Sequence, residues 1–182
     1  MNSATGPDRE YNKKITNIRQ FPLEADIETW IEQYGNGLLR LCFLQLGDYA
    51  LAEDAVQETF IRAWQHYDRF EHRSSVKTWI TTIAVNVCRS LQRSPWRRRM
   101  TSLESIPELS KSGEMPDFTV SQAVMKLPPD LKEVFLMHEL QGMKLREIAE
   151  ARHIPLATAS SRLNRARKRL RRELKEWYPY EE

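Results

Sequence analysis

The chain has 182 residues and a formal net charge of +3; hydrophobic residue types make up 41% of it and charged types 29%. This composition is polar for a globular protein and far too apolar for a disordered one. The longest uncharged run, residues 78–88, is too short to span a bilayer, and the polar N-terminus lacks the apolar segment of a signal peptide. We therefore expect a soluble, cytoplasmic protein.

The sequence offers little for enzymatic chemistry. With six glycines in all, the one Gly-x-Gly, at residues 35–37, lacks the residues that complete a nucleotide-binding fingerprint. The four histidines and two cysteines have no metal-binding spacing, so we expect no metal site and no cofactor. Cys42 and Cys88 are interpreted as small buried side chains in a reducing compartment. We expect no catalytic residue, no small-molecule substrate and no enzymatic activity.

Acidic and basic blocks alternate along the chain. Lys and Arg number 3 against 8 Asp and Glu in residues 26–70, but 7 against 1 in residues 71–99. Residues 100–118 contain 1 Lys or Arg and 4 Asp or Glu, and residues 119–182 contain 13 Lys or Arg and 9 Asp or Glu. The basic blocks favour a polyanion as partner, whereas the acidic first block needs a different explanation.

Proline marks the domain boundaries. None occurs in residues 23–94, which have helical spacing, whereas five follow in residues 95–129. We predict an all-α fold of two small helical domains joined by a flexible linker. The predicted limits are residues 1–24 for an N-terminal arm, 25–98 for the first domain, 99–118 for the linker and 119–178 for the second domain.

We predict four helical segments in the first domain, and apolar residues recur at three-to-four-residue spacing in three of them. The first segment, which starts near Trp30, ends at Gly47-Asp48. The second runs from Tyr49 to Tyr67 and has a predicted inward stripe of Ala52, Val56, Phe60, Ala63, Trp64 and Tyr67. After a break at residues 71–75, the third has a predicted inward face of Trp79, Ile80, Ile83, Ala84, Val87 and Leu91.

Packing does not explain two polar faces of these helices. Opposite its stripe, the second segment carries Glu53, Asp54, Gln57 and Glu58. This acidic face is either simply solvated or a docking surface for a basic partner. On the third, one face carries Thr78, Thr82, Asn86, Arg89 and Arg93, with Trp79 at its edge. Such a face suits unstacked bases and phosphates; the alternatives are core packing for Trp79 and solvation for the arginines.

The second domain has a helix-turn-helix pattern. A proline-marked helix start at residues 127–130 and an apolar segment precede a short helix at residues 145–150, a turn at residues 153–155 and a long helix. The predicted inward face of the long helix is Ala159, Leu163, Ala166, Leu170 and Leu174; its outward face carries Ser160, Ser161, Asn164, Arg165, Lys168 and Arg171. Such a helix enters the major groove of DNA, or alternatively binds a membrane or a partner protein.

Two stretches resemble the extracytoplasmic-function (ECF) subfamily of bacterial RNA polymerase sigma factors. Residues 48–60, Phe70, the run Lys77-Thr78-Trp79-Ile80, residues 83–86 and Arg89 resemble the helical bundle of sigma region 2. Residues 127–170 resemble the helix-turn-helix of sigma region 4. The resemblance covers about residues 25–98 and 119–176, in the order that the family has.

The resemblance implies a subunit that binds core RNA polymerase and directs it to specific promoters, as in a stress response. The implied partners are the β′ clamp helices and β subunit of the polymerase, promoter DNA, and an anti-sigma factor that holds the protein inactive. A membrane-bound anti-sigma factor would sequester it at the membrane. Region 2 would recognise and melt the −10 element, and region 4 would recognise the −35 element.

The resemblance also implies roles for individual residues. The residues implied to bind core polymerase are Glu53, Asp54, Gln57 and Glu58. Those implied to bind the −10 element are Ser74, Ser75, Lys77, Trp79, Asn86 and Arg89. Those implied to bind the −35 element are Arg146, Thr158, Ser160, Ser161, Arg162, Asn164, Arg165 and Arg167. Val76 and Ala157 depart from the family pattern, which usually has Phe and Gly there.

Two other classes of protein remain as alternatives. A stand-alone helix-turn-helix transcriptional regulator explains residues 145–172 but gives no role to the acidic face or to the polar face of the third segment. An interaction module would place the basic helix on a membrane or on a partner protein.

Overall fold

The computed structural model describes residues 24–93 and 118–175. The predicted N-terminal arm and linker lie outside the described residues, apart from Glu24 and Phe118, with which the two ranges begin. All the regular elements in these ranges are helical, and there is no strand among them, which confirms the predicted all-α fold of two helical domains. Within the same ranges, no helix has the length and apolarity needed to cross a bilayer.

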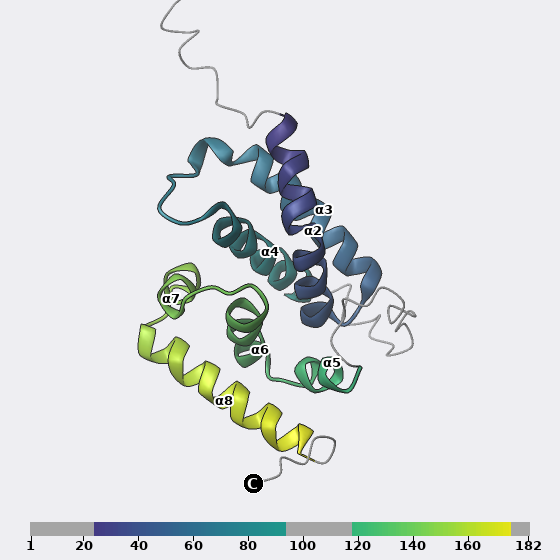
Figure 1. Cartoon of the computed structure of the whole chain (residues 1–182), viewed down its shortest axis with the longest axis vertical. Helices are drawn as coiled ribbons and strands as arrows, with labels where there is room; N and C mark the ends of the chain where they lie inside the picture. The colour runs from purple at the N-terminus through teal and green to yellow at the C-terminus, as the bar shows by residue number, and fades with distance from the viewer. Residues whose placement is uncertain (1–23, 94–117, 176–182) are drawn as a thin grey trace, which may run out of the picture.

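The first domain contains three long helices, α2 (Glu24–Leu46), α3 (Tyr49–Gln65) and α4 (Val76–Arg93), with a 3₁₀ turn η1 (Tyr67–Arg69) after α3. They lie together in the upper half of Figure 1. The predicted stop between α2 and α3 is confirmed. Gly47 has a φ of 71°, where a residue without a side chain is least strained, and the Asp48 carboxylate accepts a hydrogen bond from the Leu51 amide at 2.9 Å.

The core of this domain is formed by one face of each helix. Its buried side chains include Leu38, Leu41 and Cys42 of α2, Ala52, Ala55, Thr59, Phe60 and Ala63 of α3, and Ile80, Thr81, Ala84, Val85, Val87 and Cys88 of α4. The prediction of an inward Trp64 is wrong: its side chain is 44% exposed, because it lies one position, or about 100° of helix turn, beyond buried Ala63.

Cys42 and Cys88 are both buried and free. A side-chain hydrogen bond with Cys88, together with burial, raises the pKa of the Cys42 thiol well above its ordinary value. The thiol form is therefore strongly favoured. Both cysteines act as small packed side chains between α2 and α4.

The second domain consists of α5 (Phe118–Met125), α6 (Pro129–Phe135), a π-helical segment η4 (Leu136–Leu140), α7 (Leu145–Arg152) and α8 (Leu156–Leu174). Pro129 opens α6 as predicted. Asp130 and Glu133 both lie in its first turns, and Glu133 is buried. On α8, Ala159, Leu163, Ala166 and Leu170 are buried as predicted.

The two domains pack against each other. α5, α6 and η4 all contact α2, and Figure 1 shows α7 below α4. Buried residues from both halves form one continuous hydrophobic cluster, which includes Leu38 on one side and Leu136 on the other. The sequence predicted two helical units and a linker, but it did not predict this contact.

Candidate nucleic-acid and polymerase interfaces

The turn between α7 and α8 sets the direction of the long basic helix. The Lys144 amide donates to the Glu147 carboxylate at 2.7 Å, which caps the start of α7. His153 ends α7 in the left-handed conformation, with a φ of 52°, and the Ile154 amide donates to the Ala149 carbonyl at 3.0 Å. Pro155 then precedes the first turn of α8, where its fixed φ suits a helix start.

The buried stripe of α8 leaves a polar face toward solvent. Ser161, Asn164 and Arg165 are exposed and Ser160 is half-buried, so the small polar residues lie near the N-terminal end of the helix. Arg146, on α7, is also exposed. This geometry, a short helix and a turn followed by a long helix with an open polar face, is that of a DNA-binding helix-turn-helix.

Several predicted −35 residues already have protein partners. Arg167 binds Glu139, with its Nε at 2.8 Å and its Nη2 at 2.5 Å from Oε1. Arg162 is half-buried and lies 3.4 Å from Asp130. Thr158 is half-buried, and its carbonyl accepts from the Ser161 hydroxyl. Arg167 and Arg162 thereby link α8 to η4 and α6.

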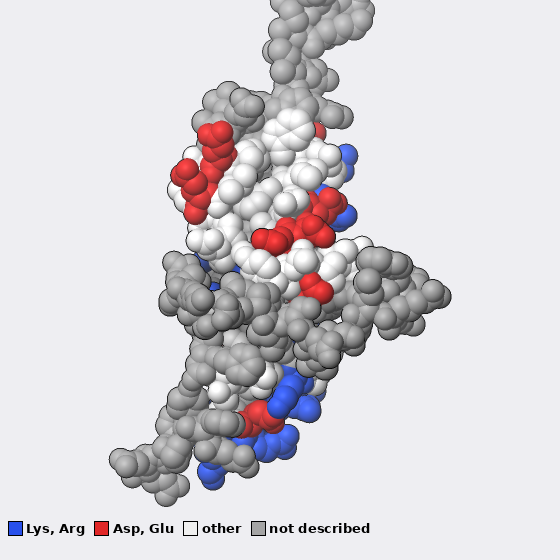
Figure 2. All heavy atoms as spheres, turned by 90° about the vertical axis from the view of Figure 1, so that its right-hand side faces the viewer, with Lys and Arg blue, Asp and Glu red and all other residues white. Residues whose placement is uncertain are grey.

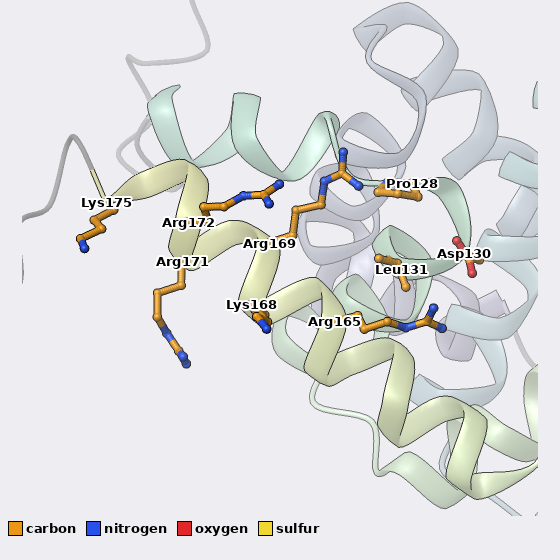
Figure 3. Close-up of a pocket in the computed structure, with 9 residues that line it drawn as sticks. All are labelled: Pro128, Asp130, Leu131, Arg165, Lys168, Arg169, Arg171, Arg172 and Lys175. Carbon is orange, nitrogen blue, oxygen red and sulfur yellow. The ribbon is translucent and has the colours of Figure 1, made fainter.

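A basic groove of about 800 Å³ continues from this face toward the C-terminal half of α8. Its floor includes Pro128 and Leu131 of the α6 start, and its cations are Arg165, Lys168, Arg169, Arg171, Arg172 and Lys175, with Asp130 as the one acid among the lining residues. In Figure 3, Arg165 and Arg169 point toward the α6 side, whereas Arg171 and Lys175 point away. Arg169, Arg172 and Lys175 were not singled out from the sequence as site residues, although the run of cations over residues 162–175 is their signal.

The acidic residues of α3 lie opposite its buried stripe. Glu53, Asp54 and Gln57 are exposed, while Glu58 is half-buried and binds Arg62 at 2.6 Å one turn along the helix. Figure 2 shows acidic side chains on the upper part of the molecule and a group of basic ones at its lower end. The acidic face of α3 and the basic face of α8 therefore belong to different domains.

Trp79 belongs to an aromatic cluster at the start of α4. Its ring stacks on Phe70 at a centroid distance of 4.8 Å and lies edge-on to Trp30 at 6.3 Å. Phe70 in turn lies 4.4 Å from the His72 ring, and His72 has a φ of 53°. The half-buried Trp79 therefore packs within the domain, and its backbone amide donates to the Ser75 carbonyl at 3.0 Å.

The other predicted −10 residues differ in their surroundings. The Ser75 hydroxyl caps α4 by accepting from the Thr78 amide at 3.0 Å, whereas Lys77 is exposed and Ser74 half-buried. Thr78 was expected on the outward polar face but is buried, because its hydroxyl donates to Glu147 of α7 at 3.0 Å. Asn86 and Arg89 also face the second domain.

Glu133 is the buried charged group at this junction. It pairs with Arg152, whose side chain is only 5% exposed, and its Oε2 lies 3.8 Å from the Nε of Arg89. Burial raises the pKa of Glu133 to about 7, although the positive charges of Arg89 and Arg162 act in the opposite direction. Within the described ranges, no group of three His, Cys, Asp or Glu side chains could hold a metal ion.

Comparison with known proteins identifies the family of the chain. The Sigma-70 region 2 model matches residues 30–98, and the Sigma-70 region 4 model matches residues 118–170. An ECF RNA polymerase sigma-E factor of Salmonella typhimurium is 32% identical over 131 residues, which is 63% of this chain and 69% of that protein. The chain belongs to the ECF RNA polymerase sigma factors.

Other sigma factors match the chain over more of its length. The ECF sigma factor SigW of Bacillus subtilis is 27% identical over 90% of this chain and 96% of its own. The sigma factor RpoE of Bartonella quintana, solved in complex with the anti-sigma factor NepR, is similar over 82% of this chain and 97% of its own, with a TM-score of 0.72 and 26% identity.

The family matches give the two domains their names. Region 2 comprises α2, α3 and α4, and region 4 comprises α5 to α8. Its two domains are therefore those of a DNA-binding transcription-initiation factor. The alternative of a stand-alone helix-turn-helix regulator is not favoured, because the region 2 match covers the part of the chain that such a regulator would not need.

Proposed function

We propose that the chain binds core RNA polymerase and directs it to specific promoters, with α8 of region 4 in the major groove of the −35 element. The observation that carries this proposal is the face of α8: four buried residues fix the helix, while Asn164 and Arg165 remain exposed on its other side. An exposed Arg midway along a recognition helix suits a guanine edge. The neighbouring groove cations suit phosphates, which carry affinity but no sequence information.

Region 2 performs two tasks in this proposal. The acidic face of α3 binds the β′ clamp helices of the polymerase, because Glu53, Asp54, Gln57 and Glu58 present a negative surface to a basic partner. The start of α4 and the loop before it bind unstacked bases of the −10 element. Unstacking a base costs a few kcal/mol, and stacking on an aromatic ring at about 1–3 kcal/mol per base offsets much of that cost.

Core polymerase makes the two modest DNA interactions selective. When both regions are mounted on one enzyme, binding of one element raises the effective concentration of the other region at its own element. The function consists of binding and positioning, with no chemical step assigned to this chain. The described residues supply no metal cluster, and the proposal requires none.

We also propose an anti-sigma factor as a regulatory partner. The support is the similarity to RpoE of Bartonella quintana, which was solved with its anti-sigma factor NepR. Such a partner would hold this cytoplasmic protein away from polymerase, and a membrane-bound one would hold it at the membrane. The β subunit, in addition to β′, is the proposed polymerase partner of region 4.

A charge-reversal experiment tests the polymerase interaction. Asp54→Arg combined with Glu58→Lys should abolish co-purification with core polymerase and run-off transcription, while circular dichroism remains helical. The matched control is Glu28→Arg with Glu32→Lys, an exposed acidic pair with the same spacing on α2. Unchanged co-purification of the α3 variant would refute the docking face. Failure of the unaltered chain to bind core polymerase in an equilibrium titration would refute the function itself.

A further inference from the structure

Leu156, the first residue of α8, is exposed although it is large and apolar. Its side chain is 44% exposed, and within the described ranges it is the one large exposed hydrophobic residue of region 4. Farther along the same helix, Leu163 belongs to the buried hydrophobic cluster and Leu174 packs against it, whereas Leu156 takes no part in that cluster. The packing of region 4 therefore gives no reason for a leucine at this position.

The charge of α8 is unevenly distributed along the helix. Residues 156–161 contain no charged side chain, whereas residues 162–172 contain seven Lys or Arg. The basic part of the helix favours a polyanion as the partner of this surface. A phosphate contact needs a hydrogen-bond donor or a positive charge, and the side chains of Leu156 and the exposed Ala157 have neither. In the first turn of α8, these two side chains can therefore offer DNA apolar contact only.

The spacing of Leu156 places it beside the residues proposed to read bases. Leu156, Ser160 and Asn164 recur every four residues, so they follow one another along one side of α8. Side chains of a helix lean toward its N-terminal end, so the Leu156 side chain extends the surface of Ser160 and Asn164 in that direction. The N-terminal residues of a recognition helix are those that contact base edges in the major groove.

From this arrangement we propose that Leu156 is a specificity-determining residue of α8 and contacts the C5-methyl group of a thymine in the −35 element. The methyl group of thymine is the apolar group that a base pair presents in the major groove, and G·C pairs lack it. Contact removes both apolar surfaces from water, so Leu156 favours an A·T pair at one position of the element. This inference rests on the proposed function of α8 and adds the residue and the chemical group that it reads.

Removal of the methyl group alone tests this contact without altering the protein. The preferred −35 sequence is selected from a randomised DNA library with holoenzyme assembled from core polymerase and the unaltered chain. Each thymine of that element, on either strand, is then replaced in turn by deoxyuridine, which forms the same base pair and lacks only the methyl group. Holoenzyme binding to each duplex is measured for the unaltered chain and for two variants.

The test variant is Leu156→Ala, and Ile31→Ala is its matched control. Ile31 is an aliphatic residue of the same size with a similar exposed fraction, 47%, but it lies on α2 of region 2. Because both side chains are exposed, both variants should keep the helical circular dichroism of the unaltered chain.

The expected result is one thymine, or two neighbouring ones, at which deoxyuridine weakens binding by the unaltered holoenzyme about fourfold. That factor is the effect of returning one buried methyl-sized group to water. At the same position, Ile31→Ala should show the same loss, whereas Leu156→Ala should bind thymine and deoxyuridine duplexes equally well. A repeated library selection with Leu156→Ala should have no preference for thymine at that position.

Two outcomes would overturn the proposal while leaving the reading of the −35 element by α8 intact. One is an equal effect of deoxyuridine on the unaltered chain and on Leu156→Ala at every thymine. The other is a selected −35 element that contains no A·T pair. If the selection finds no −35 preference at all, the proposed role of α8 fails, and the role of Leu156 fails with it.

Discussion

Glu133 provides the most direct physical test of the domain junction. Its carboxyl group is buried among Arg152, Arg89 and Arg162, and burial raises its pKa from the ordinary 4.5 to about 7. Between these two values the folded chain binds a proton at Glu133 that the unfolded chain releases. Stability from this one group is therefore greatest below pH 4.5, falls as the pH rises, and is fully lost above pH 7.

The size of the effect follows from the two pKa values. One pH unit corresponds to about 1.4 kcal/mol, so raising the pKa from 4.5 to about 7 corresponds to about 3 kcal/mol in all. Glutamine has the shape of the protonated carboxyl group and does not titrate. As the pH rises from 5 to 8, the free energy of unfolding of Glu133→Gln should therefore increase by about 2–3 kcal/mol relative to that of the unaltered chain.

Urea unfolding followed by circular dichroism at pH 5, 6, 7 and 8 measures this difference. Comparison of two variants at each pH cancels the titration of all other groups. Glu150→Gln is the control for loss of a carboxylate, because Glu150 is exposed on α7 next to the junction. If the free-energy difference between Glu133→Gln and the unaltered chain is the same at pH 5 and pH 8, the inference that Glu133 is buried with a raised pKa is refuted.

Three further predictions concern α8 and α4, the helices with the proposed DNA-binding faces. Leu163→Ala should lower the free energy of unfolding by about 2–5 kcal/mol in urea titrations, since Leu163 is 2% exposed on the inner face of α8, and a loss below 1 kcal/mol would contradict its core position. Arg165→Ala should cost about 1–3 kcal/mol at the preferred −35 sequence in holoenzyme binding assays; an equal loss on all sequences would make Arg165 a phosphate contact. Asn86→Ala should reduce promoter melting more than duplex binding, and normal permanganate footprints would argue against its role.

The parts of the fold that the sequence predicted are those set by local chemistry. Gly47 and Asp48 form the stop between α2 and α3, because left-handed backbone and an N-cap carboxylate are properties of single residues. The buried face of α8 followed from a clear apolar period against a strongly basic background. The helix-turn-helix and the family resemblance rest on such local signals.

The wrong or missing predictions depend on contacts distant in the sequence. Trp64 was placed inward together with Ala63 because both fit the apolar spacing of α3, but Ala63 is buried while Trp64, about 100° further around the helix, is 44% exposed. Thr78 was placed outward because it is polar, and it is buried because Glu147, 69 positions later, accepts its hydrogen bond. No pattern within α4 or α7 alone contains the information that these two helices meet.

The polar chemistry of the α4 side of the junction explains why the sequence did not predict it. A permanent interface leaves an apolar stripe on each partner, whereas Thr78, Asn86 and Arg89 on one side and Glu147, Arg152 and Gln141 on the other resemble ordinary surface residues. A hydrogen bond contributes only about 0.5–1.5 kcal/mol net, because water replaces it when the contact opens. These polar contacts lie beside an apolar part of the junction, where Leu38 of α2 and Leu136 of η4 belong to one buried cluster. The apolar part escaped prediction as well, because Leu136 fits the core of its own domain and its sequence neighbours do not show which helix it will meet.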